Sequence, residues 1–249
     1  ESVKTNIVDA NNPPYPLFIS GRAGSGKSTL LQYLFVNYAY FYLSKKIEHD
    51  FDYPIYFASS RDLIDETKRI IGNILSIKKN SIRSKNPKIV QFSNFDTEEY
   101  KEKGFRVFFD YLYSLIPDSI KSDKFVQSKR VDYRKFKNLW QTKFHEDKNK
   151  SNYDAERSWH VIMTFIKGFS SENYLDYDDY IGIGNKLKTV PDSKFKIIWE
   201  KVYNGWYKNE DYWDDQDLVR YIINEGLIKE KYSAIFCDEA QDFTRIELE

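Results

Sequence analysis

The residues whose types and spacing most clearly suit a chemical function are GRAGSGKS at 21–28, which follow the pattern G-x-x-x-x-G-K-S. Glycines at this spacing let the backbone turn with its N–H groups pointing inward, and a helix N-terminus adds the positive end of its dipole. Lys27 would reach the β- and γ-phosphates of a nucleotide, and the Ser28 hydroxyl would ligate Mg²⁺. The stretch predicts a phosphate-binding loop, because a glycine-rich turn without a ligand leaves Lys27 and Ser28 unexplained.

A second chemical feature lies near the other end of the chain, where four apolar residues at 234–237 run into Asp238 and Glu239. A bare carboxylate at the end of a buried strand is costly, so a positive partner is expected beside it. Mg²⁺ next to Lys27 is such a partner. Asp238 is then expected to hold Mg²⁺ directly or through water, and Glu239 to activate the attacking water as general base. The alternative for this pair is an exposed acidic turn.

The apolar runs around these motifs predict strands and helices that alternate. Short runs bounded by Pro, Gly or polar residues are typical of buried strands and occur at 17–20, 54–59 and 88–92. Longer runs with the length and apolar spacing of helices occur at 27–43 and 61–75. This order predicts an α/β fold with a parallel sheet, to which the apolar run before the carboxylates adds a further strand.

The amino-acid composition of the sequence changes at about residue 96. From there to about residue 230 the chain contains helix-length stretches rich in Tyr, Lys and Asp, and none of them reads as a strand. The simplest architecture is an α/β domain, formed by residues 1–95 and 231–249, that is interrupted by a mostly helical insertion at 96–230. The sequence shows no internal repeat of fixed period and no low-complexity tract.

The composition limits the classes of binding partner and the cellular compartment that are expected for this protein. Of the 249 residues, 41% are hydrophobic and 17% aromatic, so the chain can bury a sizeable core. Its 38 basic and 38 acidic residues cancel, which excludes the strongly basic class of nucleic-acid binders and requires a local patch for any polyanion. One cysteine, no apolar run of about 20 residues and no signal peptide favour a cytoplasmic protein without membrane contact. Because the chain begins at Glu1 and ends soon after the carboxylates, we expect it to be part of a longer protein.

Two stretches are more specific than the bare motifs, namely FISGRAGSGKSTLL at 18–31 and AIFCDEAQDFT at 234–244. Together they resemble the UvrD/Rep-like branch of superfamily 1 helicases. Two further stretches are similar to segments of the same group, namely ERSWHVIMTFIKGFSSENYLDYDDY at 156–180 and WDDQDLVRYIINEG at 213–226. The resemblance implies a RecA-like P-loop NTPase domain whose helical insertion is the 1B subdomain of that family. It also implies an ATP- and Mg²⁺-dependent helicase or translocase on single-stranded nucleic acid, with DNA favoured, that works with further helicase domains of the same protein.

The resemblance implies roles for individual residues. Lys27, Glu239 and Gln241 would be catalytic, with Gln241 coupling the nucleotide state to neighbouring motifs, and Ser28 and Asp238 would hold the metal. The nucleotide would be contacted by the loop and the start of its helix: Gly21, Arg22, Ala23, Gly24, Ser25, Gly26, Lys27, Ser28 and Thr29. The single-strand contacts of the family would fall at the ends of two strands: Ser59, Ser60 and Arg61, and Ser93, Asn94 and Phe95.

Three features depart from the family pattern. Ser59 stands where the family commonly offers an aromatic for base stacking, although Phe57 would serve if the register slips. No Gln precedes Gly21 to read adenine. The chain also has no counterpart of the second RecA-like domain, whose arginine fingers are worth about 10³–10⁵ in rate, so we expect weak binding and poor hydrolysis from this piece alone. Two other functions stay open: an ATP-dependent conformational switch in a large multidomain protein, and an interaction module with a vestigial ATP site.

Other candidate sites are weaker. The lysines and aromatics interleaved at 121–150 would suit a single-strand groove, but amphipathic helices with core aromatics and solvated lysines are favoured. In DYDDYIGIG at 176–184, Tyr180 and Ile181 occupy the positions where a calcium loop needs Asp or Asn and then Gly, so this site is excluded. The three histidines are scattered and, with a single cysteine, support no zinc site.

Overall fold

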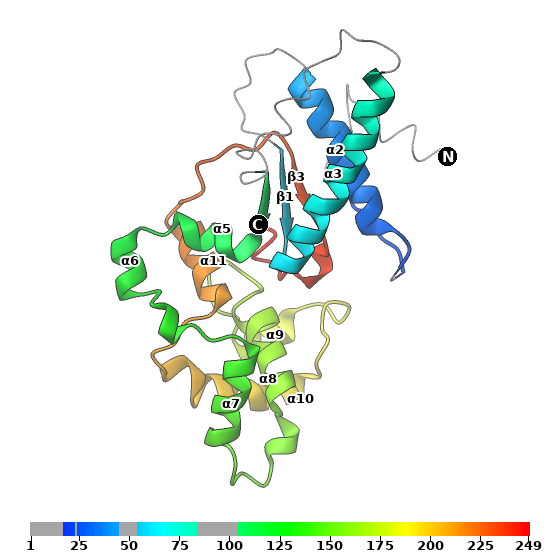
Figure 1. The fold of residues 1–249 in the computed structure, drawn as a ribbon. Coiled ribbons are helices and arrows are strands. Elements are labelled where there is room, and N and C mark those ends of the chain that lie inside the picture. The colour runs from blue at the N-terminus through cyan, green and yellow to red at the C-terminus, as the bar shows by residue number, and fades with distance from the viewer. Residues whose placement is uncertain (1–16, 23, 45–53, 84–103) are drawn as a thin grey trace. The chain divides into compact units, whose positions relative to one another are not determined.

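The computed structural model describes residues 17–22, 24–44, 54–83 and 104–249 (Figure 1). The chain forms two compact units. The sheet unit comprises residues 1–111 and 229–240, and the helical unit comprises residues 112–228 and 241–249. The domain boundaries expected from the sequence at 96 and 230 remain predictions, and the compact units divide the chain at other positions.

The sheet unit is built on three parallel strands in the order β2-β1-β3. These strands are β1 (Ile55–Ala58), β2 (Phe105–Val107) and β3 (Ile235–Cys237). Tyr56 in the middle strand lies opposite Phe105 of β2 and Phe236 of β3. All four residues of β1 are buried, as expected of a strand covered on both faces of a parallel sheet. The predicted α/β layout with a parallel sheet is confirmed, including the strands expected at 54–59 and before Asp238.

Two predictions about strands were wrong. Residues 17–20 form no strand, and Phe18 within this run is 85% exposed. The sequence predicts no strand between 96 and 230, whereas β2 forms there and pairs with β1 immediately before helix α5 (Phe108–Leu115). The strand and the helix follow one another without a turn residue between them in the mostly apolar stretch FRVFFDYLYSL, so periodicity does not mark the junction. The strand predicted at 88–92 lies outside the described residues.

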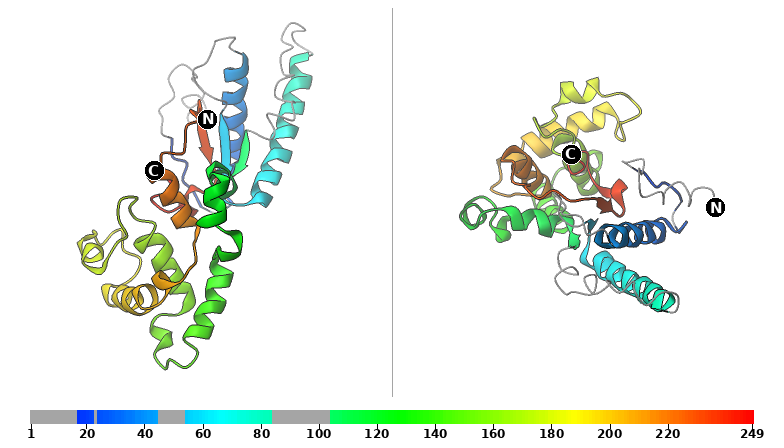
Figure 2. Two further views of the ribbon diagram at one scale, coloured as in Figure 1. Left: turned by 90° about the vertical axis from the view of Figure 1, so that its left-hand side faces the viewer. Right: turned by 90° about the horizontal axis from the view of Figure 1, so that it is seen from above.

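Two long helices, α2 (Lys27–Ser44) and α3 (Arg61–Arg83), lie side by side and pack on the sheet (Figures 1 and 2). The ring of Phe35 in α2 is fully buried at the centre of this packing. It contacts one aromatic ring from each strand, with centroids between 5.1 and 5.6 Å apart: Tyr56, Phe105 and Phe236. The predicted helices are confirmed, and the aromatic packing anchors α2 directly behind the loop at 21–28.

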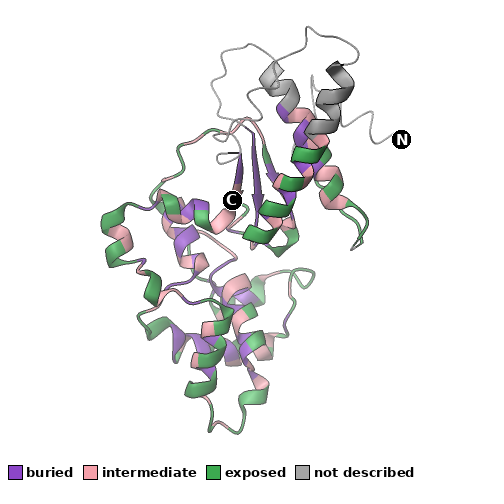
Figure 3. Cartoon of the chain, viewed as in Figure 1, coloured by how far each residue is buried: buried purple, intermediate pink, exposed green. Residues whose placement is uncertain are grey.

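The helical unit consists of short helices whose buried residues form one core of aromatic and aliphatic side chains. Buried positions of these helices are purple in Figure 3. Its helices are α6 (Asp118–Asp123), α7 (Tyr133–Lys143), α8 (Ala155–His160), α9 (Tyr177–Gly182), α10 (Asp192–Ile197) and α11 (Asp215–Asn224). Helices α8 and α10 continue as the π-helical segments Val161–Ile166 and Ile198–Asn204. Phe125, Phe136 and Trp140 are buried, so these aromatics of the stretch at 121–150 serve packing. Across the described ranges, no helix combines the length and apolar character needed to span a membrane.

The segment that follows the two carboxylates packs within the helical unit. The backbone N–H of Ile246 donates to the carbonyl of Gly168 at 3.2 Å, and the Thr244 hydroxyl donates to the side chain of Gln216 at 3.1 Å. A Cβ atom at Gly168 would lie 2.1 Å from the carbonyl oxygen of Met163 and 2.9 Å from the Cβ atom of Thr244, and both distances are too short. Glycine is therefore required where residues 241–249 approach this turn.

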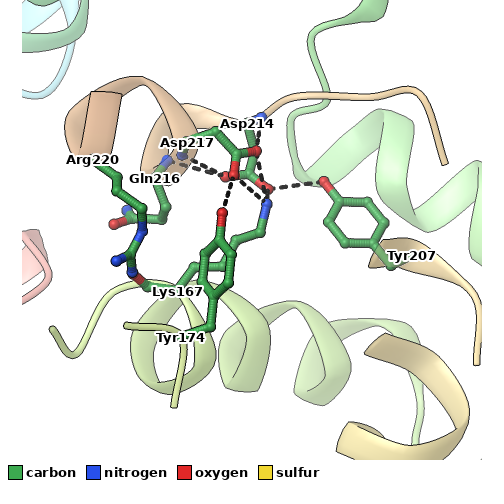
Figure 4. A network of polar contacts seen from close by, with 7 residues as sticks. All are labelled: Lys167, Tyr174, Tyr207, Asp214, Gln216, Asp217 and Arg220. Carbon is green, nitrogen blue, oxygen red and sulfur yellow. Dashed lines mark hydrogen bonds and ion pairs between the residues drawn. The ribbon is translucent and has the colours of Figure 1, made fainter. Parts of the chain in front are cut away.

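A buried ionic cluster fixes the start of helix α11 (Figure 4). The Lys167 ammonium donates to the Asp214 carboxylate at 2.7 Å and to both oxygens of Asp217 at 2.7 and 2.8 Å. Asp214 is fully buried, caps the helix by accepting from the backbone N–H of Gln216, and also accepts from the Tyr207 hydroxyl at 3.0 Å. Two carboxylates thus share one buried ammonium, which ties α11 to the chain at residue 167.

Candidate functional site

The loop at 21–28 turns sharply at two glycines. Gly24 and Gly26 have φ angles of +74° and +81°, a left-handed conformation in which L side chains are strained. The turn is closed by the backbone N–H of Ser25, which donates to the carbonyl of Arg22 at 3.1 Å. Helix α2 begins immediately after it, with Leu30 donating to the carbonyl of Gly26 at 2.9 Å. The spacing of the glycines therefore matches the backbone that the loop adopts; Ala23 lies outside the described residues.

Lys27, the first residue of α2, is folded back over this loop. Its ammonium donates to the carbonyls of Gly21 at 3.1 Å and Arg22 at 3.2 Å. Both acceptors are neutral, and a phosphate group would offer the same ammonium a charged acceptor and a stronger hydrogen bond. The loop thus holds its lysine beside the N–H groups at the start of α2, which favour an anion. Thr29 lies in the same first helical turn and is exposed.

The structure brings Ser28 and Asp238 together although they are 210 positions apart in the chain. The Ser28 hydroxyl donates to Oδ1 of Asp238 at 3.1 Å. Asp238 is positioned by the sheet, because its backbone N–H donates to the carbonyl of Phe57 at 3.0 Å and so prolongs the pairing of β3 with β1. The carboxylate is buried, and the backbone N–H of Glu239 donates to the same Oδ1 at 3.0 Å.

A third side chain, which sequence reasoning missed, completes the surroundings of Asp238. The hydroxyl of Tyr56 in β1 donates to Oδ2 of Asp238 at 3.0 Å. Burial, followed by the neighbouring negative charge of Asp238, raises the pKa of Tyr56 far above its usual value, so this hydroxyl keeps its proton. Both carboxylate oxygens of Asp238 therefore accept hydrogen bonds.

Glu239 has an unusual backbone conformation. Its φ angle is +51°, and among the described residues it is the one non-glycine with a positive φ. A left-handed conformation costs an ordinary residue about 1–2 kcal/mol, and such strain clusters at functional sites. The strain is placed directly after the strand that holds Asp238, at the residue that the sequence suggests as general base.

Replacing Glu239 by glycine should therefore separate stability from activity. We expect the sheet unit of Glu239→Gly to be more stable by about 0.5–1 kcal/mol, because glycine adopts a positive φ without strain, while ATP hydrolysis is lost. Hydrogen-exchange protection of the β1 amides would measure the stability. Glu239→Gln is the control, because it removes the carboxylate and keeps the strain; equal protection in both variants would contradict the expectation.

The structure gives less support to the remaining predicted residues. Gln241 is exposed and lies in a short 3₁₀ turn, Ala240–Asp242. Ser60 caps α3 by accepting from the backbone N–H of Leu63 at 3.3 Å, and Arg61 forms an exposed ion pair with Asp110 at 3.0 Å. Ser59 is partly exposed, and Phe57, the alternative stacking residue, is buried. The candidates at 93–95 lie outside the described residues.

The groups that converge on Asp238 suit magnesium bound together with phosphates. The available metal donors are oxygens, those of the Ser28 hydroxyl and the Asp238 carboxylate. Within the described part of the chain, no three His, Cys, Asp or Glu side chains form a group that could hold a metal by themselves. Mg²⁺ takes few protein oxygens and completes its shell with phosphate and water, so this small donor set fits it.

Comparison with known proteins gives one match. Residues 1–167 match the family model described as the KAP family P-loop domain. This segment includes the loop at 21–28 and the strands β1 and β2. No curated protein and no solved structure matches the chain. The match supports a P-loop domain and does not support the UvrD/Rep-like helicase family that the motifs resemble.

Proposed function

The chain belongs to the KAP family of P-loop NTPases, and from this membership we propose that it binds Mg²⁺–ATP at the loop 21–28 and hydrolyses it. The observation that carries the proposal is the hydrogen bond of 3.1 Å between Ser28 and Asp238. It joins the phosphate-binding loop to a buried carboxylate from a distant part of the chain. A vestigial site would have no reason to keep a buried carboxylate beside the loop, given the cost of burying it.

Each residue of the site has a chemical task in this proposal. The N–H groups of the loop and the Lys27 ammonium bind the phosphates, and Lys27 exchanges two neutral carbonyls for them. Ser28 keeps its proton on Asp238 and so directs an oxygen lone pair outward as a metal ligand. When bound, Mg²⁺ would be held by the Ser28 hydroxyl and the Asp238 carboxylate and would neutralise charge on the phosphates. Glu239 accepts the proton of the attacking water.

We further propose that hydrolysis drives a conformational switch. Asp238 and Glu239 belong to the sheet unit, whereas residues 241–249 belong to the helical unit. Within the helical unit this segment is hydrogen-bonded to Gly168 and Gln216. The strained backbone at Glu239 is therefore covalently continuous with a segment that the other unit holds. A change at this residue between nucleotide states would be passed along the chain to the helical unit.

The second candidate function, a motor on single-stranded nucleic acid, rests on the resemblance to superfamily 1 helicases. Several observations on the described residues count against it. The one aromatic near the end of β1, Phe57, is buried, and Arg61 is paired with Asp110. Three aromatics of the basic stretch at 121–150 lie in the core of the helical unit, and the chain has no net charge. In the described ranges no aromatic platform for base stacking is evident, so we rank the switch first.

The deciding experiment measures ATP turnover by the full-length protein with and without single-stranded DNA or RNA. If the protein is a switch, turnover should change less than about twofold with either polymer. Glu239→Gln should reduce turnover by about 10²–10⁴, the usual contribution of a general base. Stimulation of about tenfold or more by one polymer would overturn the switch in favour of the motor. Absence of turnover in the folded wild type would overturn the hydrolysis itself.

A further inference from the structure

Behind the site lie three buried polar side chains that neither the loop motif nor the carboxylate motif contains. They come from three elements of the sheet unit: Gln32 from α2, Thr67 from α3 and Tyr56 from β1. Their exposed fractions are 3%, 2% and 0%. Burying a polar group in this way is unfavourable unless the group has a hydrogen-bond partner.

The three side chains, here called the polar relay, extend from α2 and α3 to Asp238. Gln32 Nε2 donates to the Thr67 hydroxyl at 3.4 Å. Burial raises the pKa of the Tyr56 hydroxyl, and the nearby Thr67 side chain acts on the same hydroxyl by lowering it. Tyr56 has a single O–H, which it donates to Oδ2 of Asp238 at 3.0 Å.

Within the polar relay, Tyr56 binds the carboxylate oxygen of Asp238 that Ser28 and Glu239 do not bind. Oδ1 accepts from the Ser28 hydroxyl and from the backbone N–H of Glu239. Oδ2 accepts from Tyr56. Rotation of the carboxylate would break hydrogen bonds on both oxygens, so Tyr56 fixes the orientation in which Oδ1 faces Ser28.

We propose that Tyr56, oriented by Thr67 and Gln32, is a positioning residue that holds Asp238 in the orientation required for Mg²⁺ binding. This inference rests on the proposed function, because it concerns the metal of the same site. Residues that hydrogen-bond a metal-binding carboxylate tune metal affinity, and their loss typically costs 10–100-fold. The ring of Tyr56 packs against Phe35 and Phe105, so phenylalanine would preserve the packing and remove only the hydroxyl.

Tyr56→Phe and a matched control test the proposal. The control is Tyr38→Phe, which removes a hydroxyl from the same packed helix and sheet, one that donates to the carbonyl of Ser233 at 2.9 Å. The probe is the non-hydrolysable analogue AMP-PNP, titrated calorimetrically with Mg²⁺ in increasing concentration and with EDTA in its place. We expect Tyr56→Phe to raise the Mg²⁺ concentration for half-maximal binding by about tenfold. Its affinity for metal-free AMP-PNP should stay within about twofold of wild type, and Tyr38→Phe should change neither quantity.

A second variant tests the relay beyond Tyr56. Thr67→Val has nearly the same shape and removes the hydroxyl that lies near Tyr56 and accepts from Gln32, so it should shift the Mg²⁺ requirement in the same direction by about two- to threefold. Equal shifts in Tyr56→Phe and Tyr38→Phe, or no shift in Tyr56→Phe while the wild type needs Mg²⁺, would overturn the proposed role of the relay alone. A wild type that binds no AMP-PNP, or binds it without regard to Mg²⁺, would overturn the proposed function and the inference with it.

Discussion

Alanine in place of Lys27 should lower the affinity for Mg²⁺–ATP by at least about 100-fold. The ammonium lies over the loop and donates to the carbonyls of Gly21 and Arg22. Each hydrogen bond from a charged donor to phosphate is worth about 1.5–3 kcal/mol, so the loss of two amounts to about 3–6 kcal/mol. Every 1.4 kcal/mol is a factor of ten in the dissociation constant. Calorimetric titration of wild type and Lys27→Ala with AMP-PNP and Mg²⁺ measures the difference.

Arg69→Ala is the matched control for this variant. It removes one positive charge from the same unit, and the ion pair between Arg69 and Glu66 on α3 is exposed on both sides. Exposed pairs contribute little, so we expect affinity within about twofold of wild type and an unchanged fold. If Lys27→Ala bound the nucleotide as well as Arg69→Ala does, the loop at 21–28 would not be the phosphate site.

The parts of the site that the sequence predicted are those in which residue type and backbone conformation are tied together. Gly24 and Gly26 adopt positive φ angles that the loop pattern requires, and Asp238 follows a strand whose apolar run is visible in the sequence. Asp238 follows β3 directly, and the Ser28 hydroxyl at the start of α2 reaches it there, so motifs 210 positions apart meet. Local chemistry and topology were sufficient for this prediction.

The parts that the sequence did not predict depend on tertiary packing. β2 has three residues and is recognisable only by its pairing with β1. Tyr56 looks like an ordinary strand aromatic, and only the position of Asp238 beside it reveals a hydrogen bond. Polar side chains at Gln32 and Thr67, inside otherwise apolar helix faces, were the available signal for the relay. Such a signal is weak, because single polar residues in helices are usually solvated.

The assignment to a family shows the limit of short motifs. The loop pattern and the Asp–Glu pair follow from the chemistry of phosphate and metal binding, which all P-loop NTPases share. They therefore predicted the class of site, whereas the family rests on the match over residues 1–167. The departures noted in the sequence, Ser59 in place of a stacking aromatic and no glutamine before Gly21, were the indications that a helicase pattern did not fit fully.

Methionine in place of Lys167 should destabilise the helical unit by about 3–5 kcal/mol at neutral pH. The side chain has similar length but no charge, and it would leave Asp214 and Asp217 without the ammonium that they share. Breaking a buried ion pair by removing one partner typically costs this much, because an uncompensated charge stays buried. All five tryptophans lie between 140 and 213, inside the helical unit, so their fluorescence during urea unfolding reports on this unit. Lys196→Met is the control, because its pair with Glu200 is exposed and long at 3.9 Å.

The pH dependence of the same variant distinguishes a lost charge from a lost contact. Burial first, and then the charge of Asp217, raises the pKa of Asp214 to about 6, above the value near 3.9 of an unfolded chain, so folding favours its protonated form. The stability that this protonation contributes is complete below about pH 4 and is lost as the pH rises through 6. Lys167 lowers the Asp214 pKa, so its removal moves the loss to higher pH. The destabilisation of Lys167→Met should therefore shrink by about 1 kcal/mol or more between pH 7.5 and 5.5. Adding Asp214→Asn should recover part of the stability at pH 7.5 and flatten this dependence; a destabilisation that is equal at both pH values would mean that packing, and not the buried charge, makes Lys167 necessary.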